Sequence, residues 1–374
     1  MTLYLGLMSG TSMDGIDAAL LEIDDEGMRL LSAVCRDWPP PLRRRLRRLA
    51  EDYQHIGLVE LGQLDTSAGR EFALAAEQLL RANALPASAV RAIGSHGQTV
   101  LHQPRGDAPF TLQIGDPNII AERLGIDVVG DFRRRDLAAG GEGAPLMPAF
   151  HAAAFGIPGE ARAVVNIGGI ANVTRLTADG GVTGFDTGPG NCLLDAWARR
   201  QLRHAYDANG AWAATGTVQQ ALLERLLGEP YFSRPAPKST GRETFSDDWL
   251  DRALAGLALA PADVQATLAE LTARSIADSL KGGPMADPGT EPRRVLICGG
   301  GALNADLMAR LARALPRAAV DTTAAAGIAP EHVEAAGFAW LAHRYVCGLA
   351  GNLPAVTGAR HPLPLGALYR GGLV

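Results

Sequence analysis

One turn near the N-terminus concentrates small polar residues and carboxylates. Two apolar runs, residues 3–8 and 16–21, flank it, which predicts a β-hairpin with a polar tip. Closely spaced backbone N–H groups and hydroxyls suit a phosphate, and carboxylates suit a hydrated Mg²⁺. The candidate residues of this first tip are Gly10, Thr11, Ser12, Met13, Asp14, Gly15, Ile16 and Asp17. An ordinary Gly- and Ser-rich turn explains the same residues without any chemistry.

A second stretch, residues 163–174, repeats the order strand, small-residue tip, strand. Its candidate residues are Asn166, Gly168, Gly169 and Asn172. Because each half of the chain opens with such a hairpin, we expect a duplicated architecture in which two phosphate loops face each other across a cleft.

A third candidate is Asp186, in the sequence F-D-T-G-P-G-N. The pattern places it at the end of a strand, just before a helix that runs to Leu202, which is a functional position in α/β folds. The helix dipole would favour the ionised carboxylate, so we expect Asp186 to stay deprotonated and to accept a proton. A turn aspartate that bonds its own backbone is the alternative. Glycines that keep the loop open favour the functional interpretation.

Polar residues also follow a predicted strand at residues 91–94. His96 and Gln98 are candidate sugar contacts, because loops at the carboxyl ends of strands line ligand crevices. A structural histidine bonded to a backbone carbonyl is an equal alternative for His96. Asp116 is a further candidate, although an N-cap before Pro117 explains it without chemistry.

Three consecutive glycines, Gly299, Gly300 and Gly301, follow a buried strand at residues 294–298. They let a flat group such as an adenine ring approach the backbone. The spacing is not G-x-G-x-x-G, which disfavours a dinucleotide fold. Lys238, in P-K-S-T-G-R-E, could touch an anion or be exposed to solvent.

Composition narrows the class of protein. The 374 residues are 47% hydrophobic and 20% charged, which predicts a globular chain of about two domains. A net charge of −5 argues against a nucleic-acid surface. Neither Lys238 nor Lys281 has the glycine spacing of a P-loop. Four scattered cysteines form no metal-ligand pair and favour a reduced, cytoplasmic compartment, and residues 338–349 are too short and polar to span a membrane.

Taken together, several motifs closely resemble the anhydro-N-acetylmuramic acid kinase family, within the superfamily of actin, sugar kinases and chaperone ATPases. The resemblance extends from Leu3 to about Leu353, and it rests on the order and combination of the motifs. They are S-G-T-S-M-D-G-I-D, S-H-G-Q-T, D-F-R-R-R-D, G-A-P-L, N-I-G-G-I-A-N, F-D-T-G-P-G-N, P-K-S-T-G-R-E, C-G-G-G-A-L-N and V-E-A-A-G-F-A-W-L-A. One departure is Glu142, where we expect glutamine in the family, and it puts the role of that side chain in doubt.

The resemblance implies an α/β fold: a two-lobed, duplicated actin-like ATPase of ribonuclease H-like type, with the active site in the interdomain cleft. We place the N-terminal lobe at residues 1–135 and the C-terminal lobe at residues 136–374. The implied reaction opens the anhydro bridge of 1,6-anhydro-N-acetylmuramic acid with water and phosphorylates O6 from ATP.

The resemblance also implies roles for individual residues. Asp186 matches the family's base, and Glu334 matches an acidic position with an auxiliary role. The first tip would hold the ATP phosphates and Mg²⁺, for which no ligand set is assigned, and the three glycines would border the adenosine. The partner is a small amino sugar, with no nucleic acid or membrane partner, and a homodimer stays open.

Two other classes remain as alternatives. One is another actin-superfamily sugar kinase or a polyphosphatase, although the net charge of −5 does not favour a polyphosphate channel. The other is a non-metabolic actin-like or chaperone-like ATPase. Only an anhydro-N-acetylmuramic acid kinase is expected to show ADP release that depends strongly on the anhydro sugar.

Overall fold

The computed structural model describes residues 1–25, 27–241, 243–281 and 291–372. The chain folds into two compact units, one of residues Met1–Phe150 with His332–Val374 and one of residues His151–Glu331. This division differs from the predicted lobes, 1–135 and 136–374. The C-terminal segment belongs to unit 1 because its helix packs against the first sheet and its last strand extends that sheet. Arg242 of the P-K-S-T-G-R-E motif lies outside the described residues.

Unit 1 is built on a seven-stranded sheet with the order β12-β6-β4-β1-β2-β3, and β5 pairs with β4. The first three strands form an antiparallel meander, while β4 runs parallel to β1 and β6 parallel to β4. The strands are β1 (Thr2–Ser9), β2 (Gly15–Asp24), β3 (Gly27–Asp37), β4 (Val90–Gln103), β5 (Phe110–Ile114), β6 (Val128–Gly130) and β12 (Ala367–Tyr369). The predicted first hairpin is therefore confirmed.

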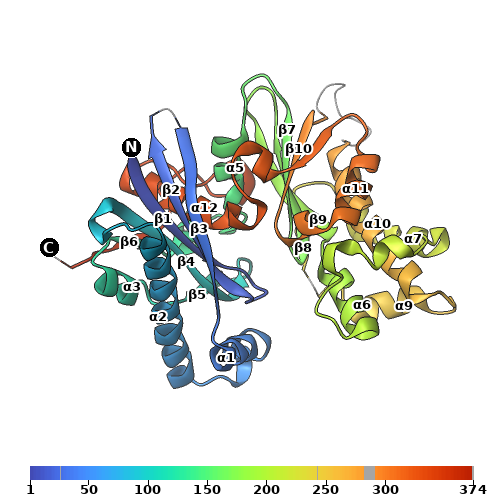
Figure 1. Ribbon diagram of the computed structural model, residues 1–374, viewed down its shortest axis with the longest axis horizontal. Coiled ribbons are helices and arrows are strands. Elements are labelled where there is room, and N and C mark those ends of the chain that lie inside the picture. The colour runs from blue at the N-terminus through green and yellow to red at the C-terminus, as the bar shows by residue number, and fades with distance from the viewer. Residues whose placement is uncertain (26, 242, 282–290, 373–374) are drawn as a thin grey trace. The chain divides into compact units, whose positions relative to one another are not determined.

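Helices cover both faces of this sheet (Figure 1). They are α1 (Pro40–Glu51), α2 (Leu58–Ala82), α3 (Pro117–Leu124), α4 (Phe132–Ala138), α12 (Val333–Val346) and α13 (Pro354–Thr357), and α5 (Met147–Phe155) contains the division between the units. Short 3₁₀ turns of the chain are η1 (Tyr53–His55), η2 (Ala87–Ala89), η3 (Ala208–Gly210), η4 (Ala213–Thr215), η5 (Gly300–Leu303), η6 (Thr323–Ala326) and η7 (Pro330–His332).

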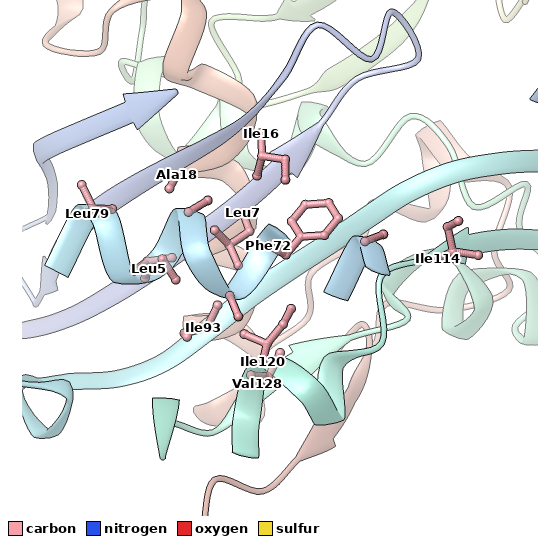
Figure 2. Packing of buried hydrophobic residues seen from close by; sticks show 14 of the residues in the cluster. Leu5, Leu7, Ile16, Ala18, Phe72, Leu79, Ile93, Ile114, Ile120 and Val128 are labelled. Atoms are coloured by element: carbon pink, nitrogen blue, oxygen red, sulfur yellow. The ribbon is translucent and has the colours of Figure 1, made fainter. Parts of the chain in front are cut away.

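The main core of unit 1 lies between the sheet and α2. Leu5, Leu7 and Ile93 of the sheet pack with Phe72 of α2 and Ile120 of α3 (Figure 2). These three sheet residues share one face because side chains alternate along a strand. The intervening glycines, Gly6 and Gly94, face the other side, where α12 crosses the sheet. A Cβ at either glycine would lie under 2 Å from a carbonyl oxygen of α12, so only glycine permits this approach.

Unit 2 repeats the arrangement on a five-stranded sheet with the order β11-β10-β7-β8-β9. Here too three antiparallel strands are followed by two parallel ones, the same order as β3-β2-β1-β4-β6 in unit 1. The strands are β7 (Arg162–Ile167), β8 (Ile170–Leu176), β9 (Val182–Pro189), β10 (Arg294–Cys298) and β11 (Ala319–Thr322). The predicted α/β class and the duplicated, two-lobed architecture are confirmed.

Two clusters of apolar side chains stabilise unit 2. One joins the sheet to α10 and α11, and the other joins α6, α7 and α9 to the opposite part of α10. The helices are α6 (Cys192–Leu202), α7 (Gln220–Leu227), α8 (Pro230–Ser233), α9 (Asp247–Leu254), α10 (Pro261–Leu280) and α11 (Ala305–Ala314). No helix in the described part of the chain is both long enough and apolar enough to cross a bilayer.

Candidate active site

The tip of the first hairpin consists of residues 10–14, and buried side chains hold it in place. Met13 adopts a positive φ of 53°, and its side chain is only 2% exposed; Ile16 is fully buried. Ser9 Oγ donates to the carbonyl of Gly15 at 2.7 Å and accepts from Trp38 Nε1 at 3.0 Å. The side chains of Met13 and Ile16 therefore anchor the tip and are not accessible to a ligand.

The polar residues of the tip lie at the surface. Thr11, Ser12 and Asp14 are exposed, and Ser12 Oγ donates to Asp14 Oδ1 at 2.8 Å. Gly10 is half-buried, and a Cβ built on it would meet only Ser12 Oγ, at 3.7 Å. This exposed turn has room for a phosphate and offers hydroxyls to it, as the sequence predicts.

Glu334 and Asp17 belong to the same charged cluster in unit 1. Glu334 lies in the first turn of α12, which the close approach at Gly6 and Gly94 places on the sheet. Burial raises the pKa of Glu334, the guanidinium of Arg133 opposes this, and the carboxylate of Asp17 in β2 adds to it. Two predicted site residues thus share an electrostatic environment with Arg133.

Arg133 is a site residue that the sequence interpretation did not assign. It comes from α4, and burial lowers its pKa while Glu334 and Asp136 raise it. Its Nε donates to His96 Nε2 at 2.9 Å, and its Nη1 donates to the carbonyl of Gly143 at 2.9 Å. Its only signal in the sequence was the motif D-F-R-R-R-D, which does not tell which arginine points inward.

His96 has both ring nitrogens engaged. Nε2 accepts from Arg133, so Nδ1 is the protonated nitrogen and donates to the carbonyl of Gly97 at 2.8 Å. Burial and the neighbouring Arg133 charge hold the pKa of His96 well below its usual value. The structural alternative for His96 therefore describes its contacts better than a direct sugar contact does.

Gln98 and Asp116 are also held by the protein itself. Gln98 Nε2 donates to the carbonyls of Gly10 and Thr99, both at 3.2 Å, so it joins β4 to the first tip. Asp116 Oδ1 accepts from the main-chain N–H of Asn118 at 2.9 Å, which confirms the predicted N-cap of α3. Asp116 and His96 border one pocket, and Gln98 is not among the residues that line it.

In unit 2 the second hairpin and the three glycines lie side by side. Carbonyls of Gly168 and Gly169 accept from the main-chain N–H groups of residues 190–192, which fixes the tip against the start of α6. Asn166 pairs with Asn172 across the hairpin. A Cβ at Gly299 would lie 2.2 Å from Asn166 Oδ1, and one at Gly301 would lie 2.3 Å from Ile167 Cγ2. Close packing thus accounts for these two glycines, whereas Gly300 is exposed and a Cβ there would meet only Asn191 Nδ2, at 3.7 Å.

Asp186 does not lie where the sequence pattern placed it. It is inside β9, paired with Asn172, and the strand continues to Pro189 before α6 begins at Cys192. Its carboxylate is not at a helix N-terminus, so the expected dipole stabilisation is wrong. Burial instead raises the pKa of Asp186 to about 6, and the main-chain N–H of Thr240, which donates to Oδ2 at 3.0 Å, opposes the rise. The group is still mainly ionised at neutral pH.

The segment 231–240 holds Asp186 in place through three hydrogen bonds, two of them to its backbone. Tyr231 Oη donates to the carbonyl of Asp186 at 2.7 Å, and the N–H of Asp186 donates to the carbonyl of Lys238 at 3.1 Å. Thr240 supplies the third, to the carboxylate. We call residues 231–240 the clamp segment.

Lys238 is neither a free anion contact nor an exposed lysine. Its Nζ donates to the carbonyls of Tyr231 at 3.3 Å and Phe232 at 3.1 Å, and it lies 4.8 Å from the centre of the Tyr231 ring. Burial lowers its pKa. Lys238 therefore joins the two ends of the clamp segment. The rarity of lysine in this chain was the one feature of the sequence that pointed to this residue.

Glu142 lies at the surface of unit 1. Glu142 Oε1 accepts from Arg105 Nε at 2.9 Å in an exposed ion pair. Among the residues that the structure describes, no three His, Cys, Asp or Glu side chains are grouped closely enough to hold a metal ion. A Mg²⁺ at the first tip would thus be held by one or two carboxylates, a phosphate and waters, which is usual for this ion.

Sequence comparisons with known proteins match nearly the whole chain. A sequence model of the family described as anhydro-N-acetylmuramic acid kinase matches residues 2–371. The anhydro-N-acetylmuramic acid kinase of Xanthomonas axonopodis pv. citri (strain 306) is 53% identical over 370 residues, covering 98% of each chain. That of Shewanella pealeana (strain ATCC 700345 / ANG-SQ1) is 50% identical over 369 residues, again covering 98% of each. A solved ROK family glucokinase from Streptomyces griseus, in complex with glucose and AMPPNP, has a TM-score of 0.41 and 16% identity, covering 91% of this chain and 99% of that one.

Proposed function

Because this chain belongs to the anhydro-N-acetylmuramic acid kinase family, we propose that it uses ATP to phosphorylate 1,6-anhydro-N-acetylmuramic acid while water opens the anhydro bridge. The products are N-acetylmuramate 6-phosphate and ADP. The structural observation that supports this reaction is Asp186, a positioned carboxylate with a pKa of about 6.

Asp186 acts as the general base in this proposal. A base works best when its pKa lies near the working pH, and burial brings Asp186 close to that range. It takes a proton from the water that attacks the anomeric carbon. The bridge bond to that carbon breaks, and the freed O6 attacks the γ-phosphate. The same carboxylate stabilises the positive charge that develops on the sugar.

Each unit offers candidate contacts for the nucleotide. In unit 1, exposed Thr11, Ser12 and Asp14 at the first tip bind phosphate oxygens, together with main-chain N–H groups of the tip. Asp14 and Asp17 are the carboxylates that Mg²⁺ would use, and the ion supplies charge neutralisation when bound. In unit 2, Asn166, Gly168, Gly169 and Asn172 at the second tip are the candidate phosphate contacts, and Gly299–Gly301 are the candidate contacts of the adenosine.

Glu334 and Arg133 assist at the sugar in unit 1. Glu334 is an auxiliary acidic group whose charge Arg133 balances. His96 and Gln98 support this site indirectly, because His96 orients Arg133 and Gln98 orients the first tip. We retain them and Asp116 as members of the substrate region on these terms.

The cellular setting follows from the substrate. Anhydro amino sugars arise from cell-wall turnover, so we place the enzyme in peptidoglycan recycling, in the cytoplasm, where ATP is available. The relatives named above carry the kinase name, which favours this reaction over the polyphosphatase and chaperone-like ATPase alternatives.

The test is product analysis after reaction in ¹⁸O-labelled water with anhydro-N-acetylmuramic acid and ATP. The proposal expects one ¹⁸O at the anomeric position, an unlabelled phosphate ester at O6, and one ADP for each sugar opened. Release of labelled phosphate with the sugar still anhydro would instead identify an ATPase. ADP release that does not depend on the anhydro sugar would contradict the proposal in the same way.

A further inference from the structure

Unit 1 contains a pocket of about 410 Å³ beside the middle of β4, the carboxyl ends of β5 and β6, and the first turns of α2 and α3. We propose that this pocket is a second binding site for an uncharged or cationic sugar, adjacent to the proposed substrate region, with which it shares His96 and Asp116. Its volume lies within the range of small-molecule sites. Such a ligand differs from the proposed substrate, which bears a carboxylate.

His96 lies between the pocket and the Glu334 cluster. Its ring borders the pocket, lies 4.7 Å from that of Phe338 in α12, and accepts a hydrogen bond from Arg133 at Nε2. Ser95 precedes His96 in β4, so its side chain points to the other face of the sheet, with Ile93 and the α2 core. A ligand beside Ser95 would therefore bind on the α2 side of the sheet.

Two polar groups that line the pocket lack a partner within the protein. Ser95 is 3% exposed and its Oγ makes no hydrogen bond, and Oε1 of Gln113 is likewise buried and unbonded. A buried polar group without a partner costs about 1–3 kcal/mol. Hydroxyl groups of a bound sugar would satisfy both atoms.

The protein itself engages most carboxylate oxygens of the pocket. Asp65 accepts from the main-chain N–H groups of Gly115, at 2.7 Å, and Asp116, and Asp131 Oδ2 accepts from Tyr369 Oη at 2.6 Å. Asp116 caps α3 with Oδ1, and among the described residues its Oδ2 accepts no hydrogen bond. Burial and the Asp116 charge raise the pKa of Asp65. Oδ2 of Asp116 accepts hydrogen bonds, so the ligand must donate one to it.

The net charge of the pocket indicates which class of sugar it binds. The pocket contains three carboxylates, those of Asp65, Asp116 and Asp131, against one guanidinium, that of Arg134, which already lies 3.5 Å from Asp131. The remaining negative charge repels a carboxylate or a phosphate ester. Leu58 and Leu61 form an apolar wall on the α2 side, which suits the C–H face of a pyranose ring.

The test measures binding of N-acetylglucosamine, glucosamine and N-acetylmuramic acid to the full chain by calorimetry, and locates N-acetylglucosamine in soaked crystals. We expect the first two sugars to bind, with density beside Ser95, and N-acetylmuramic acid to bind there at least tenfold more weakly. Ser95→Ala should weaken N-acetylglucosamine about five- to tenfold. It should leave the unfolding midpoint unchanged or higher, because it removes an unsatisfied group.

Matched controls separate a site from a general surface effect. Ser67→Ala, on the same unit but outside the pocket, should leave sugar affinity unchanged. Leu58→Trp narrows the pocket from an exposed position and should weaken binding, whereas Val59→Trp beside it should not. Equal affinity for N-acetylmuramic acid at this pocket, unchanged affinity in Ser95→Ala, or sugar density only elsewhere would each overturn the proposal. None of these results depends on kinase activity.

Discussion

The main-chain N–H of Thr240 donates a hydrogen bond to Oδ2 of Asp186 at 3.0 Å. This bond leaves Oδ1 available to a water molecule and fixes the plane of the carboxylate. It also opposes the effect of burial, which would otherwise raise the pKa of Asp186 further. The hydrogen bond from Thr240 thus limits the rise in the pKa of Asp186 that burial causes.

Replacement of Asp186 tests its role directly. Asp186→Asn should reduce kcat by about 10²- to 10⁴-fold, the usual contribution of a general base. The amide oxygen can still accept from Thr240, so the fold and the affinity for ATP should be retained. Steady-state kinetics together with nucleotide binding by calorimetry checks both parts, and near-normal turnover would rule out Asp186 as the base.

The pKa of Asp186 predicts how activity and stability depend on pH. Because the base must be ionised, kcat/KM should fall as the pH drops below about 6. The free energy of unfolding should instead increase as the pH drops. The folded pKa is raised above the unfolded value of 3.8, so the contribution of this group is fully present below about pH 4 and is lost as the pH rises through 6.

Thermal unfolding of Asp186→Asn across pH checks the stability part. This variant should be more stable than the parent above pH 6, and the difference should vanish near pH 4. A constant difference over that range would show that Asp186 does not titrate with a raised pKa.

The clamp segment can be tested through its lysine. Lys238→Met removes two hydrogen bonds from Nζ to carbonyls and frees residues 231–240 from their tether. We expect kcat to fall about tenfold with little change in the KM for ATP, because a charge-assisted hydrogen bond contributes about 1.5–3 kcal/mol. Lys281→Met, which alters the exposed Lys281–Asp278 pair, is the control and should keep full activity. Equal activity in both variants would remove Lys238 from the positioning of Asp186.

Substitutions at two adjacent glycines distinguish a role in packing from a role in nucleotide binding. Gly301→Ala places a Cβ 2.3 Å from Ile167 Cγ2 and should cost about 1–3 kcal/mol of stability. At Gly300 the nearest atom to a new Cβ is Asn191 Nδ2 at 3.7 Å, so Gly300→Ala should fold normally. If Gly300 borders the adenosine, this substitution should still raise the KM for ATP several-fold. Chemical denaturation and ATP titration measure the two effects, and an unchanged KM would leave Gly300 outside the nucleotide site.

Local patterns predicted much of this protein. The two glycine-tipped hairpins, the cap at Asp116 and the strand at residues 294–298 follow from period-two apolar alternation and turn chemistry, which act within a few residues. Other boundaries were wrong. The helix α2 begins at Leu58, well before the potential cap residue Asp65, which lies inside it and accepts from the N–H of Gly115 in a distant loop. The strand at residues 91–94 continues to Gln103, because β5 pairs with its second half.

The sequence alone determined the α/β class, the duplicated hairpins and the residues from which a phosphate site could be built, because those depend on local periodicity and residue type. Only the tertiary structure decided that Arg133 donates hydrogen bonds to both His96 and Gly143. It also decided that residues 231–240 bind Asp186, and that the C-terminal helix α12 places Glu334 against the first sheet. Burial, which raises the pKa of Asp186, depends on contacts between segments up to 54 residues apart. The periodicity of a single sequence does not reveal such contacts.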